Sequence, residues 1–278
     1  MSDATALNRI GSFGLDLSNE AFVIVIENSE REFFFTHFPE SSLPKLDLDD
    51  YGNDPCCVAQ AIRRHLRLPR GPIDNLVNVL EDAGIIIILA DFGTQLIDGF
   101  ALLTNGAPPL IFVNSNMPMD RIRYSLCHEL GHIILHTIPH PNIEKEANLF
   151  AAEFLAPAEE IGPYLDNMSL DTVASLKPYW KMAMSALIVR AKHLGKLDDN
   201  QYRYLWMKMN SLGFMRREPV QLDLPYEEPT LLQEILDTHL NELNYTVPEM
   251  CKMLMIYEDD FRRWYLPNKK ENHLKMVK

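Results

Sequence analysis

Apolar residues along the chain fall into two patterns: short continuous runs, and positions spaced three or four residues apart. The runs are rich in β-branched and aromatic residues and predict strands, because such side chains pack well on a pleated sheet. These strands are expected within 20–38 and at 85–89, 98–103 and 110–113. Asn105-Gly106, between the last two strands, is the dipeptide that tight antiparallel hairpins favour.

The spaced positions predict helices, since residues three and four apart line one face of a helix. In the first half, the expected helices cover 56–67, 73–83, 120–136 and 144–155. Further helical segments are expected near 158–166, 169–175, 179–194, 198–211 and 230–244, followed by two short helices within 247–265. We expect Asp120 to cap the helix that it begins, and Pro178 to break a later one.

The order of these elements predicts both the fold class and the division of the chain. A strand-containing N-terminal segment, a core, a helical extension and a C-terminal helical segment are expected over 1–54, 55–160, 161–218 and 230–278. The stretch 217–230 is acidic, contains three prolines and is expected to be a linker. The fold class is α+β: a small antiparallel β-sheet packed on a helical core, with a mostly helical C-terminal extension.

Composition excludes some classes of function. The 278 residues are 47% hydrophobic, enough for a sizeable core, and the formal net charge is −13. An acidic chain does not wrap nucleic acid over its whole surface, because phosphate binding needs clustered Lys and Arg. The four cysteines form no CxxC pair, and the longest apolar run, 85–90, is far shorter than the ~20 residues that span a bilayer. With no signal-peptide pattern at the N-terminus, we expect a reduced, cytoplasmic protein without membrane contact.

The chemistry is concentrated in the sequence His-Glu-Leu-Gly-His, where His128 and His132 lie four residues apart on a predicted helix. That spacing places both imidazoles on one face, where they can share one Zn²⁺ ion. A zinc ion lowers the pKa of a coordinated water to about 7, and Glu129 can take the proton from that water. Gly131 is expected to leave room beside the metal.

A third ligand is expected from the helix that follows, because catalytic zinc sites hold the ion with three protein ligands. Three glutamates compete: Glu144, Glu146 and Glu153. We favour Glu144, because the small residues Ala147 and Ala151 allow close packing of its helix on the histidine helix. Glu146 points about 160° away from Glu144 on a helical wheel. Glu146 and Glu153 are therefore interpreted as solvated surface, although Glu146 is kept as the alternative ligand.

Five further residues surround this motif. Asn148 is either a hydrogen-bond partner of a ligand imidazole or a surface amide, and Tyr124 is a candidate oxyanion stabiliser that competes with a role as a core aromatic. His136 is interpreted as a structural group at the helix end, and His140 as a loop residue near the metal or without a role. Cys127 is interpreted as a small buried residue.

Four blocks of sequence together resemble the ImmA/IrrE family of metallopeptidases: 98–100, 111–114, 121–136 and 144–157. The resemblance covers about 55–160, and 176–219 looks like the helical extension of longer family members. It implies a zincin-like core in which His128, His132 and Glu144 hold Zn²⁺ and Glu129 is the general base. The chain departs from the family pattern at Cys127, where alanine is usual, and at Ala156, where methionine is usual.

The resemblance also implies a regulatory role and a kind of partner. Family members typically cleave or control helix-turn-helix repressors of mobile elements or stress responses, so we expect an endopeptidase with such a repressor as its protein substrate. Two alternatives stay open: a zinc-binding regulator without turnover, and a DNA-binding regulator. The second would use the C-terminal helices and their basic residues Arg262, Arg263, Lys269 and Lys270. Residues 1–54 do not resemble the helix-turn-helix module with which longer family members often begin.

Overall fold

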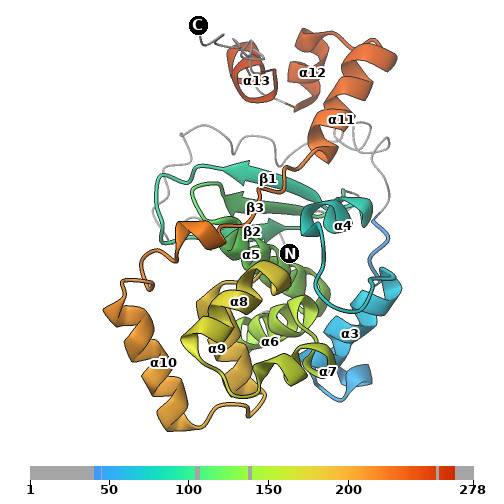
Figure 1. The fold of residues 1–278 in the computed structure, drawn as a ribbon. Helices are drawn as coiled ribbons and strands as arrows, with labels where there is room; N and C mark the ends of the chain where they lie inside the picture. The colour runs from blue at the N-terminus through green and yellow to red at the C-terminus, as the bar shows by residue number, and fades with distance from the viewer. Residues whose placement is uncertain (1–40, 45, 104–106, 137–139, 255–256, 267–278) are drawn as a thin grey trace, which may run out of the picture. The chain divides into compact units, whose positions relative to one another are not determined.

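Figure 1 shows the computed structural model, which describes residues 41–44, 46–103, 107–136, 140–254 and 257–266. Within these residues the chain divides into two compact units, one ending at Pro229 and the other beginning at Thr230. The strands expected within 20–38 and the turn expected at Asn105-Gly106 lie outside the described residues.

The first unit contains a three-stranded sheet formed by β1 (Ile86–Ala90), β2 (Gly99–Leu102) and β3 (Leu110–Asn114). The strand order is β1-β3-β2, with β1 parallel and β2 antiparallel to the central β3. The α+β class is confirmed, but the sheet is mixed rather than antiparallel throughout. A simple meander would place β2 at the centre. Instead, β3 is the central strand. All five of its residues are buried, as expected for a strand with neighbours on both sides, whereas only one β2 residue is buried.

Helices cover one face of this sheet and continue away from it (Figure 1). They are α3 (Pro55–His65), α4 (Leu76–Asp82), α5 (Met119–Leu135), α6 (Ile143–Leu155), α7 (Ala158–Ile161), α8 (Leu170–Trp180), α9 (Met184–His193) and α10 (Asp199–Ser211). Three short 3-10 turns accompany them: η1 (Leu48–Tyr51), η2 (Gly162–Leu165) and η3 (Val220–Leu222). Helix α5 packs on β2 and β3, α6 packs on α5, and α3 packs on α6. The histidine helix is thereby enclosed between the sheet and a second helical layer.

Helices α5 and α6 approach closely because small residues lie at their contact. A Cβ atom added at Gly131 would lie 3.2 Å from the Cα atom of Ala147 and 3.3 Å from the ring of Phe150. Ala147 and Ala151 are fully buried, in agreement with the close packing expected from their size. The space at Gly131 is therefore filled by the α6 backbone, and the expectation that it lies open beside a metal is wrong.

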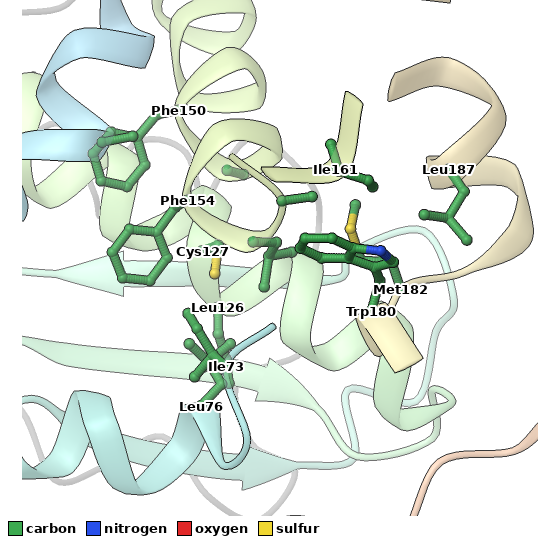
Figure 2. Close-up of a cluster of buried hydrophobic side chains, with 14 of the residues drawn as sticks. Ile73, Leu76, Leu126, Cys127, Phe150, Phe154, Ile161, Trp180, Met182 and Leu187 are labelled. Atoms are coloured by element: carbon green, nitrogen blue, oxygen red, sulfur yellow. The ribbon is translucent and has the colours of Figure 1, made fainter. Parts of the chain in front are cut away.

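The hydrophobic core joins α5, α6 and the helices that follow them (Figure 2). Leu126 and Cys127 of α5 lie near Phe150 and Phe154 of α6, and all four side chains are fully buried. Trp180, at the end of α8, is 1% exposed and extends this core towards the neighbouring helices. Burying a large aromatic or aliphatic side chain stabilises a fold by about 1.5–3 kcal/mol, so this cluster fixes the position of α5.

Two buried ion-pair networks hold the N-terminal half of α5. Lys177 of α8 contacts both Asp120 and Glu218, with 2.6 Å between its Nζ atom and the Glu218 carboxylate. Arg123 pairs with Glu227, whose carboxylate also accepts hydrogen bonds from the first backbone N–H groups of α4. Asp120 is thus a buried ion-pair partner inside α5 rather than its cap, since Pro118 occupies the N-cap position.

These contacts also change the interpretation of residues 217–230. Glu218 and Glu227 lie at the two ends of this stretch, and each is held by a buried cation. A linker is free of such anchors, so the expected linker is instead a packed strap across the first unit.

The expected break at Pro178 is also wrong, because α8 continues through it to Trp180. A proline near a helix C-terminus removes only one intrahelical hydrogen bond, and Lys181 then ends α8 in a left-handed conformation.

The second unit contains α11 (Leu231–Asp237), the π-helical turn η4 (Thr238–Glu242), α12 (Val247–Leu254) and α13 (Glu258–Tyr265). Thr246 and Glu249 exchange the two hydrogen bonds of a capping box at the start of α12. Among the described residues, no helix is long and apolar enough to cross a membrane.

Candidate metal centre

Helix α5 brings His128 and His132 together on one face, as the four-residue spacing predicts. Their Nε2 atoms lie 3.0 Å apart, and the two rings meet edge to face with centroids 4.7 Å apart. Both side chains are mostly buried, with 18% and 12% of their surface exposed. The two imidazoles therefore present one ring nitrogen each to the same point in space.

Glu144 completes the group from the first turn of α6. Its carboxylate oxygens lie 3.3 Å from the Nε2 atom of His128 and 3.7 Å from that of His132. The three ligand atoms lie within 4.8 Å of one another, and the Glu144 side chain is 58% exposed. The site is therefore open to solvent on its carboxylate side.

The geometry of this triad fits a zinc ion. Zn²⁺ takes imidazole nitrogens and carboxylate oxygens at about 2.0–2.2 Å, which places two tetrahedral ligand atoms about 3.3 Å apart. The 3.0 Å between the two imidazole nitrogens and the 3.3 Å from His128 to one Glu144 oxygen lie close to that value, and the other oxygen of the same carboxylate lies 3.7 Å from His132. Three protein ligands with one open side is the arrangement of catalytic rather than structural zinc sites.

Glu129 lies between the two histidines of the motif, one residue after His128 on α5. Only 8% of its surface is exposed, in contrast to Glu144. A carboxylate held by a packed helix is fixed in position, whereas an exposed one samples several rotamers. Glu129 thus has the residue type of a general base, and it lies in a packed helix next to a candidate ligand in the sequence.

Tyr124 and Asn148 contact one another beside the triad. The Tyr124 hydroxyl donates to the Asn148 side-chain oxygen at 3.1 Å, and the Asn148 side-chain nitrogen donates to the backbone oxygen of Glu144 at 2.7 Å. Asn148 therefore supports the backbone of Glu144 rather than an imidazole. Burial raises the pKa of Tyr124 to about 12, so its hydroxyl keeps its proton at neutral pH.

A second group of polar side chains adjoins the triad. The Nε2 atom of His136 lies 3.1 Å from a Glu146 carboxylate oxygen, and that of His140 lies 3.4 Å from the same oxygen. The Nδ1 atom of His136 lies 2.9 Å from the Nδ1 atom of His132. Burial lowers the pKa of His136 and outweighs the opposing effect of Glu146. With 17% of its side chain exposed, Glu146 is not the solvated surface residue expected from the sequence.

Glu153, the third glutamate of α6, is also buried rather than solvated. It pairs with Arg190 of α9 and accepts a hydrogen bond of 2.8 Å from Gln60 of α3. Arg190 further donates to the backbone oxygen of Ala156. This network joins α3, α6 and α9, and its contacts are structural. Cys127, as expected, is fully buried, and burial raises the pKa of its thiol.

Sequence reasoning thus named the triad and Glu129 but missed the group around His136. One signal was present: His128, His132 and His136 continue a single row at four-residue spacing, and Glu146 lies in the first turn of the helix that follows. The C-terminal residues proposed for DNA contact are only partly described. Arg262 pairs with Glu258 at 2.6 Å within α13, and Lys269 and Lys270 lie outside the described residues.

Comparison with known protein families gives a match over part of the chain. Residues 80–192 match the family model Peptidase M78, which is described as the IrrE N-terminal-like domain. The matched region begins before β1 and ends in α9, so it includes the sheet, α5, α6 and every residue of the two His-His-Glu groups. No curated protein matches the sequence at a significant level.

Proposed function

We propose that the protein is a zinc-dependent metallo-endopeptidase, from the match of residues 80–192 to the Peptidase M78, or ImmA/IrrE, family model and from the geometry of the site in this region. The family match supports a metallopeptidase-like role for this domain. The observation that carries the proposal is the convergence of His128, His132 and Glu144 at separations suited to one tetrahedral ion. A bound zinc ion supplies Lewis acidity, which acidifies a coordinated water and polarises a peptide carbonyl.

Side chains of this protein supply the proton transfer, the hydrogen bond to the carbonyl oxygen and the access for substrate. Glu129, held in the packed α5 helix, accepts the proton of the attacking water and returns it to the leaving amine. Tyr124 keeps its proton, because burial raises its pKa, and it can donate to the carbonyl oxygen when its bond to Asn148 opens. The exposed side of Glu144 is where a peptide segment reaches the reacting groups.

The proposed substrate is a protein partner, specifically a helix-turn-helix transcriptional repressor of a mobile element or of a stress response. This part of the proposal rests on the resemblance of the four sequence blocks to regulatory ImmA/IrrE proteins. The net charge of −13 is consistent with a protein rather than a nucleic acid as the partner of the core. The proposed place of action is the cytoplasm, where such repressors bind DNA.

The first experiment separates metal binding from turnover. Zinc content is measured by elemental analysis, at one equivalent of zinc, on wild type, Glu144→Ala and Glu129→Gln. We expect about one zinc per chain in wild type and in Glu129→Gln, and its loss in Glu144→Ala. Glu146→Ala is the matched variant, because it removes a neighbouring carboxylate of the same helix. Zinc lost in Glu146→Ala but kept in Glu144→Ala would overturn the ligand assignment.

The second experiment looks for the substrate in cells. New protein N-termini are quantified by proteomics in cells that express wild type or Glu129→Gln, with Glu159→Gln of the exposed α7 surface as the control. We expect new termini inside a helix-turn-helix protein with wild type and Glu159→Gln only. Zinc-loaded wild type that generates no new terminus would instead favour the regulator without turnover. Salt-sensitive binding of the purified chain to DNA would favour the DNA-binding alternative.

A further inference from the structure

We propose that His136, His140 and Glu146 form a second binding site for a transition-metal ion such as Zn²⁺, coupled to the first site through the contact between His132 and His136. The site is contributed by the C-terminal end of α5, the segment before α6 and the first turn of α6. It goes beyond the proposed peptidase function, which needs only the first triad.

The ligand set and its spacing repeat those of the first triad. Each group has two imidazoles and one glutamate, and the ligand atoms of each lie within 4.8 Å of one another. In the second group a single Glu146 oxygen lies 3.1 Å from one imidazole nitrogen and 3.4 Å from the other. Both separations agree with the roughly 3.3 Å edge of a tetrahedral zinc site.

Burial distinguishes this group from a chance cluster on the surface. His136 and Glu146 have only 5% and 17% of their side chains exposed, whereas His140 is 39% exposed at the rim. Two ligands are therefore held by packing, and the third approaches from the side that faces solvent. That arrangement lets a metal ion enter without unpacking the helices.

The two sites share a pair of ring nitrogens, which couples them. When His132 holds a metal ion through Nε2, its Nδ1 atom carries the proton of the neutral ring and can donate to the Nδ1 atom of His136, 2.9 Å away. His136 then carries its own proton on Nε2 and donates it to Glu146. This chain of hydrogen bonds orients His132, as outer partners of metal ligands generally do.

A metal ion in the second site breaks that chain. Its coordination to His136 Nε2 moves the ring proton of His136 to Nδ1, so that two N–H groups face each other between His136 and His132. The hydrogen bond is lost, and two donors repel across 2.9 Å. Loss of such an outer partner lowers metal affinity about 10–100-fold. Because coupling is reciprocal, the first ion weakens the second site by the same factor.

The test counts metal ions at controlled free zinc. Glu129→Gln protein, which cannot turn over, is dialysed against a series of zinc buffers, and its zinc content is measured by elemental analysis. We expect two steps, the second at higher free zinc. His140→Ala in the same background should keep the first step and lose the second, as should Glu146→Gln. His193→Ala, which removes an exposed histidine of α9, should keep both steps.

A second variant tests the coupling and separates this proposal from the peptidase function. In the double variant His128→Ala/Glu144→Ala the first site is removed, and one zinc should bind about 10–100-fold more tightly than the second zinc does in the parent. A single parent step that survives His140→Ala, or a second step that survives His140→Ala, would overturn the second site. A single parent step that is lost in His140→Ala but kept in His128→Ala/Glu144→Ala would mean that the peptidase proposal fails and the second site stands.

Discussion

The polar side chains in the two halves of α5 have different kinds of partner. In the N-terminal half, Asp120 and Arg123 are buried against side chains of opposite charge, Lys177 and Glu227. In the C-terminal half, imidazole nitrogens face one another, at 3.0 Å in the case of His128 and His132, and face carboxylates. Each charged side chain of the first half is therefore neutralised by an oppositely charged side chain of the protein. In the second half, nitrogen and oxygen atoms with lone pairs converge in two His-His-Glu groups, which is an arrangement that can bind a cation.

This contrast shows how one helix can serve stability and chemistry together. The buried ion pairs fix α5 against α8 and against the strap formed by residues 217–230, and the core at Leu126 and Phe150 fixes it against α6. The histidines are therefore held by a helix that is fixed elsewhere, and their ring nitrogens face one another and the carboxylates of α6. Variants in the two halves should therefore change different measurements.

The largest expected effect on stability is in the N-terminal half. Arg123→Met leaves the buried carboxylate of Glu227 without its cation, and loss of one partner of a buried pair lowers the free energy of unfolding by about 3–5 kcal/mol. The double variant Arg123→Met/Glu227→Gln removes both charges and should recover most of that loss. Urea unfolding measures both variants. Equal losses in the single and double variants would show that packing, not charge, is the cause.

Metal removal should have the next largest effect, and it should act through the C-terminal half. At free zinc 100 times the dissociation constant of the first site, and below that of the second, bound metal adds about 2.7 kcal/mol to the free energy of unfolding. EDTA should remove this increment from wild type, seen as a lower thermal midpoint. His132→Ala should show no such change. An equal shift in His132→Ala would place the stabilising ion outside the first triad.

Gly131→Ala should have an intermediate effect, because Gly131 lies at the close contact between α5 and α6. The added Cβ lies 3.2 Å from a backbone atom of Ala147, which cannot move without shifting α6. We expect a loss of about 1–3 kcal/mol from overpacking, offset by up to about 1 kcal/mol of gained helix propensity. Zinc affinity should also fall, because α6 carries Glu144. A net gain in urea stability would show that the helix contact is looser than this structure has it.

The proximity of His128, His132 and Glu144 was more predictable than the strand pairing, for a physical reason. His128 and His132 lie on one helix, so their proximity follows from helix geometry alone, and Glu144 follows once the next helix packs back through Ala147. Glu146 was misread because a helical wheel gives direction around its own helix only. It meets His136, which directly follows the last residue of α5, and His140 in the segment before α6, so its partners depend on how that connecting segment packs.

Long-range pairings were the least predictable features. Nothing local distinguishes a mixed sheet from an antiparallel one when three short apolar strands follow one another, because the choice depends on which strand is buried at the centre. The strap at 217–230 has a linker-like composition, and its role depends on Glu218 and Glu227 meeting cations about 40 and 100 residues earlier in the chain. Such contacts arise from tertiary packing, which overrides local propensity.

The smallest expected effect uses an exposed charge of the same N-terminal half as a contrast to Arg123. Arg121 makes two hydrogen bonds to Asp98, at 2.6 and 2.9 Å, but the side chains are 52% and 39% exposed. Solvent already satisfies both groups, so Arg121→Ala should lower the free energy of unfolding by only about 0.2–1 kcal/mol, and less at high salt. Urea unfolding at low and high ionic strength measures this difference. A loss as large as that of Arg123→Met, unchanged by salt, would mean that burial does not set the contribution of charges on α5.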